Sequence, residues 1–222
     1  MMKNRWIALL SFALVLGIAA PAASYKYKGW QAGPWEKHKT KDGMTMYLNE
    51  EVSSGVHGVR VDTVVDMPAS KLFPVLMDAD RQREYSFIRE FRIISHNNKI
   101  GYLYQRVRAT GIQDRDFTVK LTLVWPETEN GGPYGWIWEQ ANEKGPAPRD
   151  GIVRADVVSG SYVLTPVANG TKTRISYRLW FDPSSWVPDF LINGAVRDAG
   201  FETVRELRRA AKLIKETGTW KE

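Results

Sequence analysis

The sequence predicts an α+β fold in which a curved antiparallel β-sheet wraps around one long C-terminal helix. Two observations carry this prediction. The stretch from Phe91 to Phe181 consists almost entirely of strand-like segments separated by turns. An amphipathic helical pattern then runs from about Asp189 to Glu216. A sheet with one apolar face must cover that face, and the long terminal helix is the natural cover.

The first half of the chain is predicted to supply an opening pair of strands and two short helices. The strands are the β-rich segments 44–48 and 56–65, which a Ser-Ser-Gly turn separates. A helix with one apolar face begins at Pro68 and ends near Asp80, and a second short helix is expected from Arg81 to Arg89. The segment 25–35 is expected to be a short lead-in without a long helix, because its glycines and proline break one.

Six further strands are expected in the second half, and two of them alternate clearly. Their predicted ranges are 91–95, 102–109, 117–125, 135–141, 152–166 and 171–181. Apolar residues take every second position from Phe117 onward and again from Ile175 to Phe181. One face of the sheet is therefore predicted to be apolar and the other wet, with Trp180 on the wet face.

The N-terminus predicts export. Lys3 and Arg5 precede an apolar run, 6–20, and the small-residue stretch 20–24 follows, in the order of a secretory signal peptide. An uncleaved membrane anchor is the less favoured alternative, because the run is shorter than the roughly 20 residues of a spanning helix and ends at Pro21. We expect cleavage near the end of the small-residue stretch and a periplasmic or secreted mature protein.

Composition excludes several classes of function. The chain has 222 residues, of which 43% are hydrophobic and 25% charged, as in ordinary globular proteins. A net charge of +6 without a dense basic stripe argues against nucleic acid as a partner. The absence of cysteine excludes disulfides and thiolate chemistry. The three histidines lie far apart, so no metal site and no cofactor is expected, and no nucleophile elbow is present.

Small residues along the inner side of the terminal helix raise the question of a cavity. Gly194, Ala195, Ala199 and Gly200 face a sheet that carries large aromatic residues. If the helix contributes little bulk, the space between helix and sheet can become a pocket of lipid size. The alternative is a dry core in which large and small side chains interdigitate, and composition alone favours it.

Five segments resemble one known family in their order and spacing. They are 35–47, 65–78, 160–166 with the turn after it, 182–193, and above all Asp-Arg-Asp-Phe at 114–117. Together they are similar to the steroidogenic acute regulatory-related lipid transfer (START) family. The resemblance implies a helix-grip fold of about nine strands and a tunnel for a sterol, phospholipid, fatty acid or isoprenoid. Leu121 stands about where sterol-handling members often have an arginine, so the ligand preference does not carry over.

The N-terminal pattern and the resemblance together predict a domain organisation and a function. A signal peptide, 1–24, would precede a single START-like lipid-binding domain, 25–222. The expected function is that of a monomeric, non-enzymatic carrier or sensor of a lipid or sterol-like molecule, with transient contact to membrane surfaces. The alternative is an enzyme like the polyketide aromatases and cyclases of the wider helix-grip superfamily, which would use the same cavity.

The candidate ligand-binding residues combine the apolar sheet face, the two flanking helices and a few polar groups. They are Phe73, Met77, Gln105, Phe117, Leu121, Leu123, Trp136, Trp138, Arg154, Tyr177, Leu179, Phe181, Leu191, Ala195 and Ala199. Arg154 either points inward to bind a head group or points outward and pairs with Asp156 or a neighbouring strand. Arg115 and Asp116 are expected to be structural in the first place, with a head-group contact as the alternative.

Overall fold

The computed structural model of the chain describes residues 35–49, 57–108, 111–126, 132–155, 157–182 and 189–220. Within these ranges the side chains of 57, 157, 158, 189–193 and 195 are excluded from the description. The predicted signal peptide lies outside the described residues. None of the helices in the described part of the chain is long and apolar enough to cross a bilayer.

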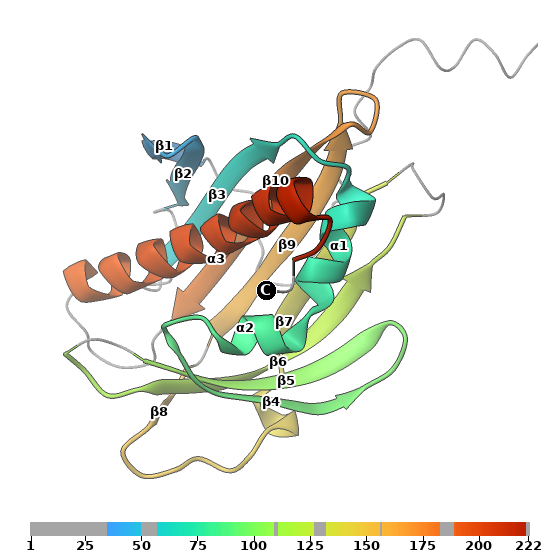
Figure 1. Cartoon of the computed structure of the whole chain (residues 1–222). Coiled ribbons are helices and arrows are strands. Elements are labelled where there is room, and N and C mark those ends of the chain that lie inside the picture. Colours follow the sequence, from blue (N-terminus) through green and yellow to red (C-terminus); the bar gives the residue numbers. More distant parts are fainter. Residues whose placement is uncertain are drawn as a thin grey trace, which may run out of the picture. The chain divides into compact units, whose positions relative to one another are not determined.

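One ten-stranded sheet forms the framework (Figure 1). Its spatial order is β1-β2-β3-β10-β9-β7-β6-β5-β4, all antiparallel, with the short β8 added parallel to β6. The strands are β1 (Glu36–Lys41), β2 (Met44–Asn49), β3 (His57–Val65), β4 (Ile88–His96), β5 (Ile100–Val107), β6 (Arg115–Val124), β7 (Tyr134–Gln140), β8 (Val153–Arg154), β9 (Val157–Val167) and β10 (Lys172–Asp182). The predicted antiparallel sheet is confirmed.

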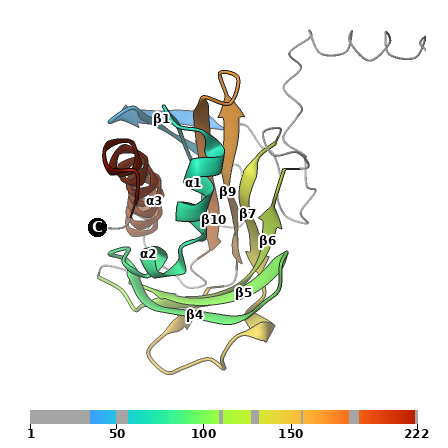
Figure 2. The same ribbon diagram turned by 45° about the vertical axis from the view of Figure 1, so that its right-hand side comes forward.

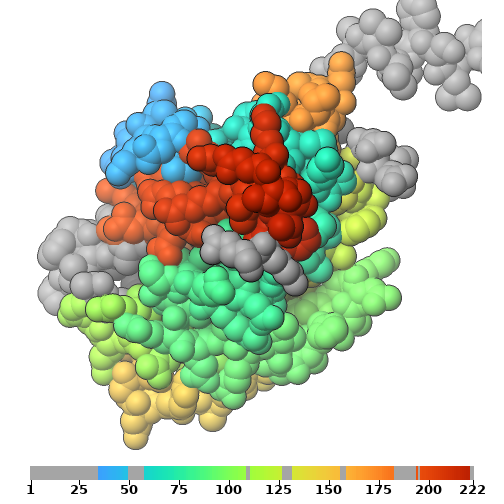
Figure 3. All heavy atoms as spheres, in the orientation of Figure 1, coloured from blue at the N-terminus to red at the C-terminus, as the bar shows by residue number. Residues whose placement is uncertain are grey.

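The helices all lie on one side of the sheet (Figures 1 and 2). They are α1 (Ala69–Met77), α2 (Ala79–Arg83) and the long α3 (Asp189–Thr217). A 3-10 turn, Asn142–Lys144, lies on the other side of the sheet (Figure 1). Figure 2 shows the sheet bending, so that β4 and β5 run beneath α2 while β9 and β10 stand beside α1 and α3. From this side the atoms of the three helices cover much of the sheet (Figure 3).

The terminal helix approaches the sheet most closely over β3. Gly200 of α3 allows this approach, because a Cβ atom there would lie 3.3 Å from Cγ2 of Val61 and 3.7 Å from the methyl groups of Val59. Both valines are fully buried. The main core therefore lies between α3, α1 and the strands β2, β3 and β10. On the same part of α3, Val196, Ala199 and Thr203 line the cavity described below.

The first strand was not predicted. Its sequence, Glu-Lys-His-Lys-Thr-Lys, is polar throughout and all six residues are exposed, so no alternation marks it. It forms because Asp42 and Gly43 adopt positive φ angles of 52° and 71°, and the chain turns back to pair β1 with β2. Pairing with a neighbour, not burial of its own side chains, makes this segment a strand.

Two other predicted elements are corrected. The second short helix ends at Arg83 and not at Arg89, and β4 already begins at Ile88. The segment predicted as one strand, 152–166, contains two: β8 pairs with β6, whereas β9 pairs with β7 and β10. Sequence alternation does not show which neighbour a strand pairs with, so it could not separate them.

The prediction that Trp180 lies on a wet face is wrong. Trp180 is 4% exposed and meets the ring of Trp35 edge-on at a centroid distance of 5.1 Å. Gly58 on the neighbouring strand leaves room for its indole. The chain preceding β1 therefore covers part of the outer face with an aromatic side chain, which the alternation within β10 could not reveal.

Candidate ligand cavity

A cavity of about 590 Å³ lies between the bent sheet, the α1–α2 segment and the middle of α3. This volume is in the range of roughly 300–1,000 Å³ that is usual for small-molecule sites. Strand alternation builds its walls. On β6, for example, Arg115, Phe117, Val119 and Leu121 all face the cavity, while the residues between them face the other way.

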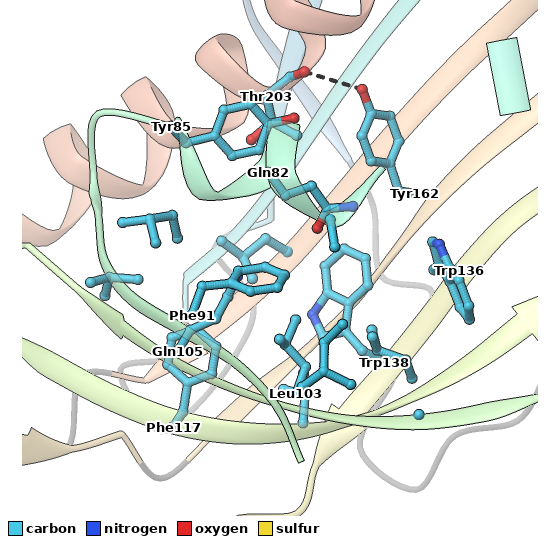
Figure 4. A pocket seen from close by; sticks show the side chains of 18 of the residues that line it. Gln82, Tyr85, Phe91, Leu103, Gln105, Phe117, Trp136, Trp138, Tyr162 and Thr203 are labelled. Atoms are coloured by element: carbon cyan, nitrogen blue, oxygen red, sulfur yellow. Dashed lines mark hydrogen bonds between the residues drawn. The ribbon is translucent and has the colours of Figure 1, made fainter. Parts of the chain in front are cut away.

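Most of the candidate residues lie on the wall of this cavity. They are Met77, Gln105, Phe117, Leu121, Leu123, Trp136, Trp138, Tyr177, Leu179, Phe181 and Ala199. Figure 4 shows Phe117, Gln105 and Leu103 on one side of the space and Trp136 and Trp138 on another. Their contact with a ligand remains a prediction. The side chains of Leu191 and Ala195 lie outside the described part of the chain.

Phe73 does not line the cavity. It is 6% exposed and packs in the core, with ring centroids 5.1 Å from Trp125 and 5.4 Å from Tyr134. Met77, one helical turn further along α1, does reach the cavity. The helical pattern identified one apolar face correctly, but that face is divided between the core and the cavity.

Arg154 does not point into the cavity either, and the outward alternative is the one observed. Its Nε and Nη2 atoms donate to the carboxylate of Asp116 at 2.7 and 3.3 Å, and Nη2 also donates to the carbonyl of Pro146 at 3.0 Å. In the β6–β8 ladder Arg154 is the partner of Asp116. It therefore shares the face of Asp116, which is opposite to the face of Phe117 and the cavity.

Arg115, in contrast, does line the cavity, as does Arg108. Arg115 is 3% exposed, and its Nη1 donates to the carbonyl of Gln113 at 2.5 Å. Burial lowers the pKa of the Arg115 guanidinium. An arginine nevertheless remains charged at any ordinary pH, so this side chain brings a positive charge to an otherwise mainly apolar wall. Alternation with Phe117, two residues later, was the sequence signal that could have placed it there.

A group of hydroxyls lies on the side of the cavity formed by α2 and α3 (Figure 4). The Tyr162 hydroxyl donates to the Thr203 carbonyl at 3.1 Å, and the rings of Tyr162 and Tyr177 meet edge-on at 5.5 Å. Tyr85 and Gln82 line the same region, where the Gln82 side chain donates to the Leu76 carbonyl at 2.8 Å. Burial raises the pKa values of the Tyr85, Tyr162 and Tyr177 phenols.

These three phenols are expected to stay protonated when ordinary tyrosines ionise. In an ultraviolet pH titration of the folded protein they should not contribute to the phase near pH 10, and Tyr177→Phe should leave the amplitude of that phase unchanged. In concentrated urea, where all tyrosines are exposed, the same variant should lose one tyrosine's amplitude. Because the folded-state pKa values lie above the unfolded value, stability should be fully present below about pH 10 and fall as the pH rises above it.

Polar contacts hold α2 and the segment after it against α3. The backbone N–H and hydroxyl of Ser86 both donate to the Glu202 carboxylate, at 2.9 and 2.8 Å. Arg81 donates to the backbone carbonyl of Glu206 at 3.2 Å. Sequence reasoning missed this side of the cavity, including Gln82 and Tyr85, because it follows from the docking of α2 and the short segment after it onto a helix remote in sequence. It also missed Phe91 of β4, which lines the cavity beside Gln105 and Phe117 (Figure 4).

A curved antiparallel sheet that closes on a C-terminal helix around an apolar cavity defines a helix-grip protein. The START domain family model matches residues 20–217, and the chain belongs to this family. The predicted family is thereby confirmed.

Individual relatives agree with the family. The chain is 23% identical over 184 residues to the mitochondrial steroidogenic acute regulatory protein of Mus musculus, a match that covers 79% of this chain and 63% of that protein. It therefore spans less than two thirds of the length of this relative. The structure of a StAR-related lipid transfer protein fragment from Xanthomonas axonopodis superposes with a TM-score of 0.67 at 22% identity, covering 80% of this chain and 98% of that one.

A further structure shares the fold at lower similarity. It is the ZhuI aromatase/cyclase from Streptomyces sp. R1128, with a TM-score of 0.56 and 14% identity over 73% of this chain and 98% of that one. At this identity the likeness concerns the fold alone.

Proposed function

We propose that this START domain binds a lipid or another apolar small molecule in its cavity and carries or senses it without changing it chemically. The observation that carries the proposal is the cavity of about 590 Å³ under α3, whose wall is mainly apolar. Burial of apolar ligand surface there contributes about 25 cal/mol per Å² before the costs of association are subtracted. The START relatives support a ligand of lipid type.

The ionisable groups of the wall favour carriage over catalysis. A general acid or base works best with a pKa near the working pH. The three phenols on the wall are shifted in the opposite sense, away from neutrality. Among the described residues no Asp or Glu lines the cavity, and the histidine on its wall, His96, is exposed to solvent. An aromatase- or cyclase-like reaction would therefore find hydrogen-bond donors in this cavity but no carboxylate base.

The proposal also covers where the protein acts and how its cargo reaches the cavity. We propose that the chain is exported to the periplasm or beyond, as the N-terminal sequence suggests, and acts as a monomer. Transient membrane contact is supported by Met77 and Ile93, which line the cavity although they are 42% and 48% exposed. Apolar side chains at the border of a lipid cavity can meet the bilayer surface from which the cargo is taken.

The test uses the chain expressed at full length and purified from the producing cells. We expect the protein to be found in the periplasm or medium with its N-terminus close to residue 25, and to carry an extractable lipid that mass spectrometry detects. After removal of that lipid it should take up apolar molecules from vesicles. An intact Met1 in the cytoplasm would overturn the location, and neither bound lipid nor uptake would overturn the binding function.

A further inference from the structure

We propose that the cargo carries an uncharged oxygen group, a hydroxyl or a carbonyl, which accepts a hydrogen bond from the Tyr85 hydroxyl inside the cavity. The inference rests on the proposed function and narrows its substrate class. Tyr85 follows α2 and lines the cavity on the same side as Gln82 and Thr203 (Figure 4). With Tyr162 and Tyr177 it brings three phenols to a wall that is mainly apolar.

Tyr85 differs from the other two phenols in its partners. The Tyr162 hydroxyl donates to the Thr203 carbonyl at 3.1 Å, and a hydrogen bond joins the side chains of Tyr177 and Thr203. In the described part of the chain the Tyr85 hydroxyl has no hydrogen-bond partner. A hydroxyl enclosed among apolar side chains is costly unless a partner is supplied. An oxygen atom of the cargo supplies that partner.

The surroundings of Tyr85 hold its ring in position. The ring stacks on that of Phe87, with a centroid distance of 5.5 Å and 22° between the planes. The next residue, Ser86, donates twice to Glu202 of α3, and the Tyr85 carbonyl accepts from the N–H of Ile88 at 2.9 Å. A donor that is fixed before the cargo arrives loses little further freedom on binding, so its hydrogen bond contributes more to affinity.

The charges around Tyr85 favour an uncharged partner. Arg81 and Glu206 form an ion pair at 3.7 Å, and Glu202 accepts from Ser86. The two carboxylates outnumber the one guanidinium, so an anionic head at this place would meet a net negative charge. Burial raises the pKa of the Tyr85 phenol, which therefore remains a neutral donor at ordinary pH.

Gln82 adds an acceptor to the site. Its amide nitrogen donates to the Leu76 carbonyl at 2.8 Å, and its side chain lies on the same side of the cavity as Tyr85 (Figure 4). The oxygen of the same amide can only accept hydrogen bonds. A cargo hydroxyl finds both a donor and an acceptor on this wall, whereas a carbonyl uses the donor alone. We therefore expect an alcohol to suit the site better than a ketone.

The test compares four ligands that share one straight chain and differ in the head. Hexadecanol, 2-hexadecanone, hexadecane and palmitic acid are supplied from cyclodextrin to the delipidated protein at pH 7.5, where each displaces a neutral fluorescent probe. Tyr85→Phe removes only the phenol oxygen. We expect this variant to bind hexadecanol and 2-hexadecanone at least about fivefold more weakly than the wild type. Its affinities for hexadecane and palmitate should change by less than about twofold.

Tyr47→Phe is the matched control. It removes the same oxygen from a tyrosine of β2 that is also partly buried, whose ring contacts the Arg60 guanidinium and which does not line the cavity. This variant should bind all four ligands like the wild type. If Tyr85→Phe does not fold, the infrared spectrum of 2-hexadecanone bound to the wild-type protein decides. A hydrogen bond should lower the carbonyl stretching frequency below its value in hexane, and an unshifted band would contradict the proposal.

The outcomes separate the two proposals. Unchanged affinity for both oxygen-bearing ligands in Tyr85→Phe, or an equal loss for hexadecane, overturns the role of Tyr85 while lipid binding stands. A loss for only one of the two identifies the group that the site takes, and an equal loss for palmitate overturns the preference for an uncharged head. Failure of every ligand and of the probe to bind the wild-type protein overturns both proposals.

Discussion

Tryptophan in place of Ala199 is expected to reduce ligand uptake at least tenfold without destabilising the ligand-free protein. Ala199 belongs to the cavity wall on α3, opposite the sheet. An indole added there would occupy part of the about 590 Å³ that the ligand needs. Filling an empty cavity normally stabilises a protein, whereas forcing the same bulk into a packed core costs about 1–3 kcal/mol.

The measurement pairs a thermal unfolding curve with a displacement titration. Asp198→Trp is the control, because Asp198 is the preceding residue of the same helix and is exposed. It should bind ligand like the wild type. A marked loss of stability in Ala199→Trp, with Asp198→Trp unaffected, would mean that the protein's own side chains fill the space and that the carrier function is wrong.

Replacing Asp116 with alanine is expected to lower the free energy of unfolding by about 3–5 kcal/mol. Asp116 is 1% exposed and accepts hydrogen bonds from the Tyr104 hydroxyl and from two nitrogens of Arg154. Tyr104 is itself fully buried. The substitution therefore leaves a buried hydroxyl and a largely buried guanidinium without their acceptor.

Urea unfolding of the single variants checks this value. Glu139→Ala is the control: it breaks an ion pair at 3.0 Å with Lys120, which lies on the same strand as Asp116, and because this pair is only partly buried it should contribute no more than about 1 kcal/mol. The folded Asp116→Ala protein should bind ligand with unchanged affinity, since the network faces away from the cavity. A large loss of affinity at unchanged stability would show that Asp116 and Arg154 belong to the ligand site after all.

Alternation carried most of the successful sequence predictions. The period of two from Phe117 to Leu123, and again from Tyr177 to Phe181, identified residues that the structure places on one wall of the cavity. The period of 3.6 in the terminal helix did the same for Ala199. These patterns record which side chains share a face, and burial of that face is the dominant favourable contribution to folding.

The sequence was least informative about charged residues. Arg115 and Arg154 both lie on strands among apolar neighbours. Arg115 nevertheless lines the cavity, whereas Arg154 pairs with Asp116 on the opposite face of the sheet. The phase of β6 was sufficient to place Arg115. The phase of Arg154 depends on the parallel pairing of the short β8 with β6, a long-range contact that no local pattern records.

By itself the sequence determined the class of fold, the family, and the apolar face of each long element, because these follow from local periodicity and from short motifs in a set order. Only the tertiary structure decided that space remains under the helix, and that Arg115 faces it. The volume depends on how closely α3 approaches the sheet, which is set by contacts between residues far apart in sequence, such as Gly200 against Val61. Whether two apolar surfaces touch or stand apart is a property of their packing and not of either surface alone.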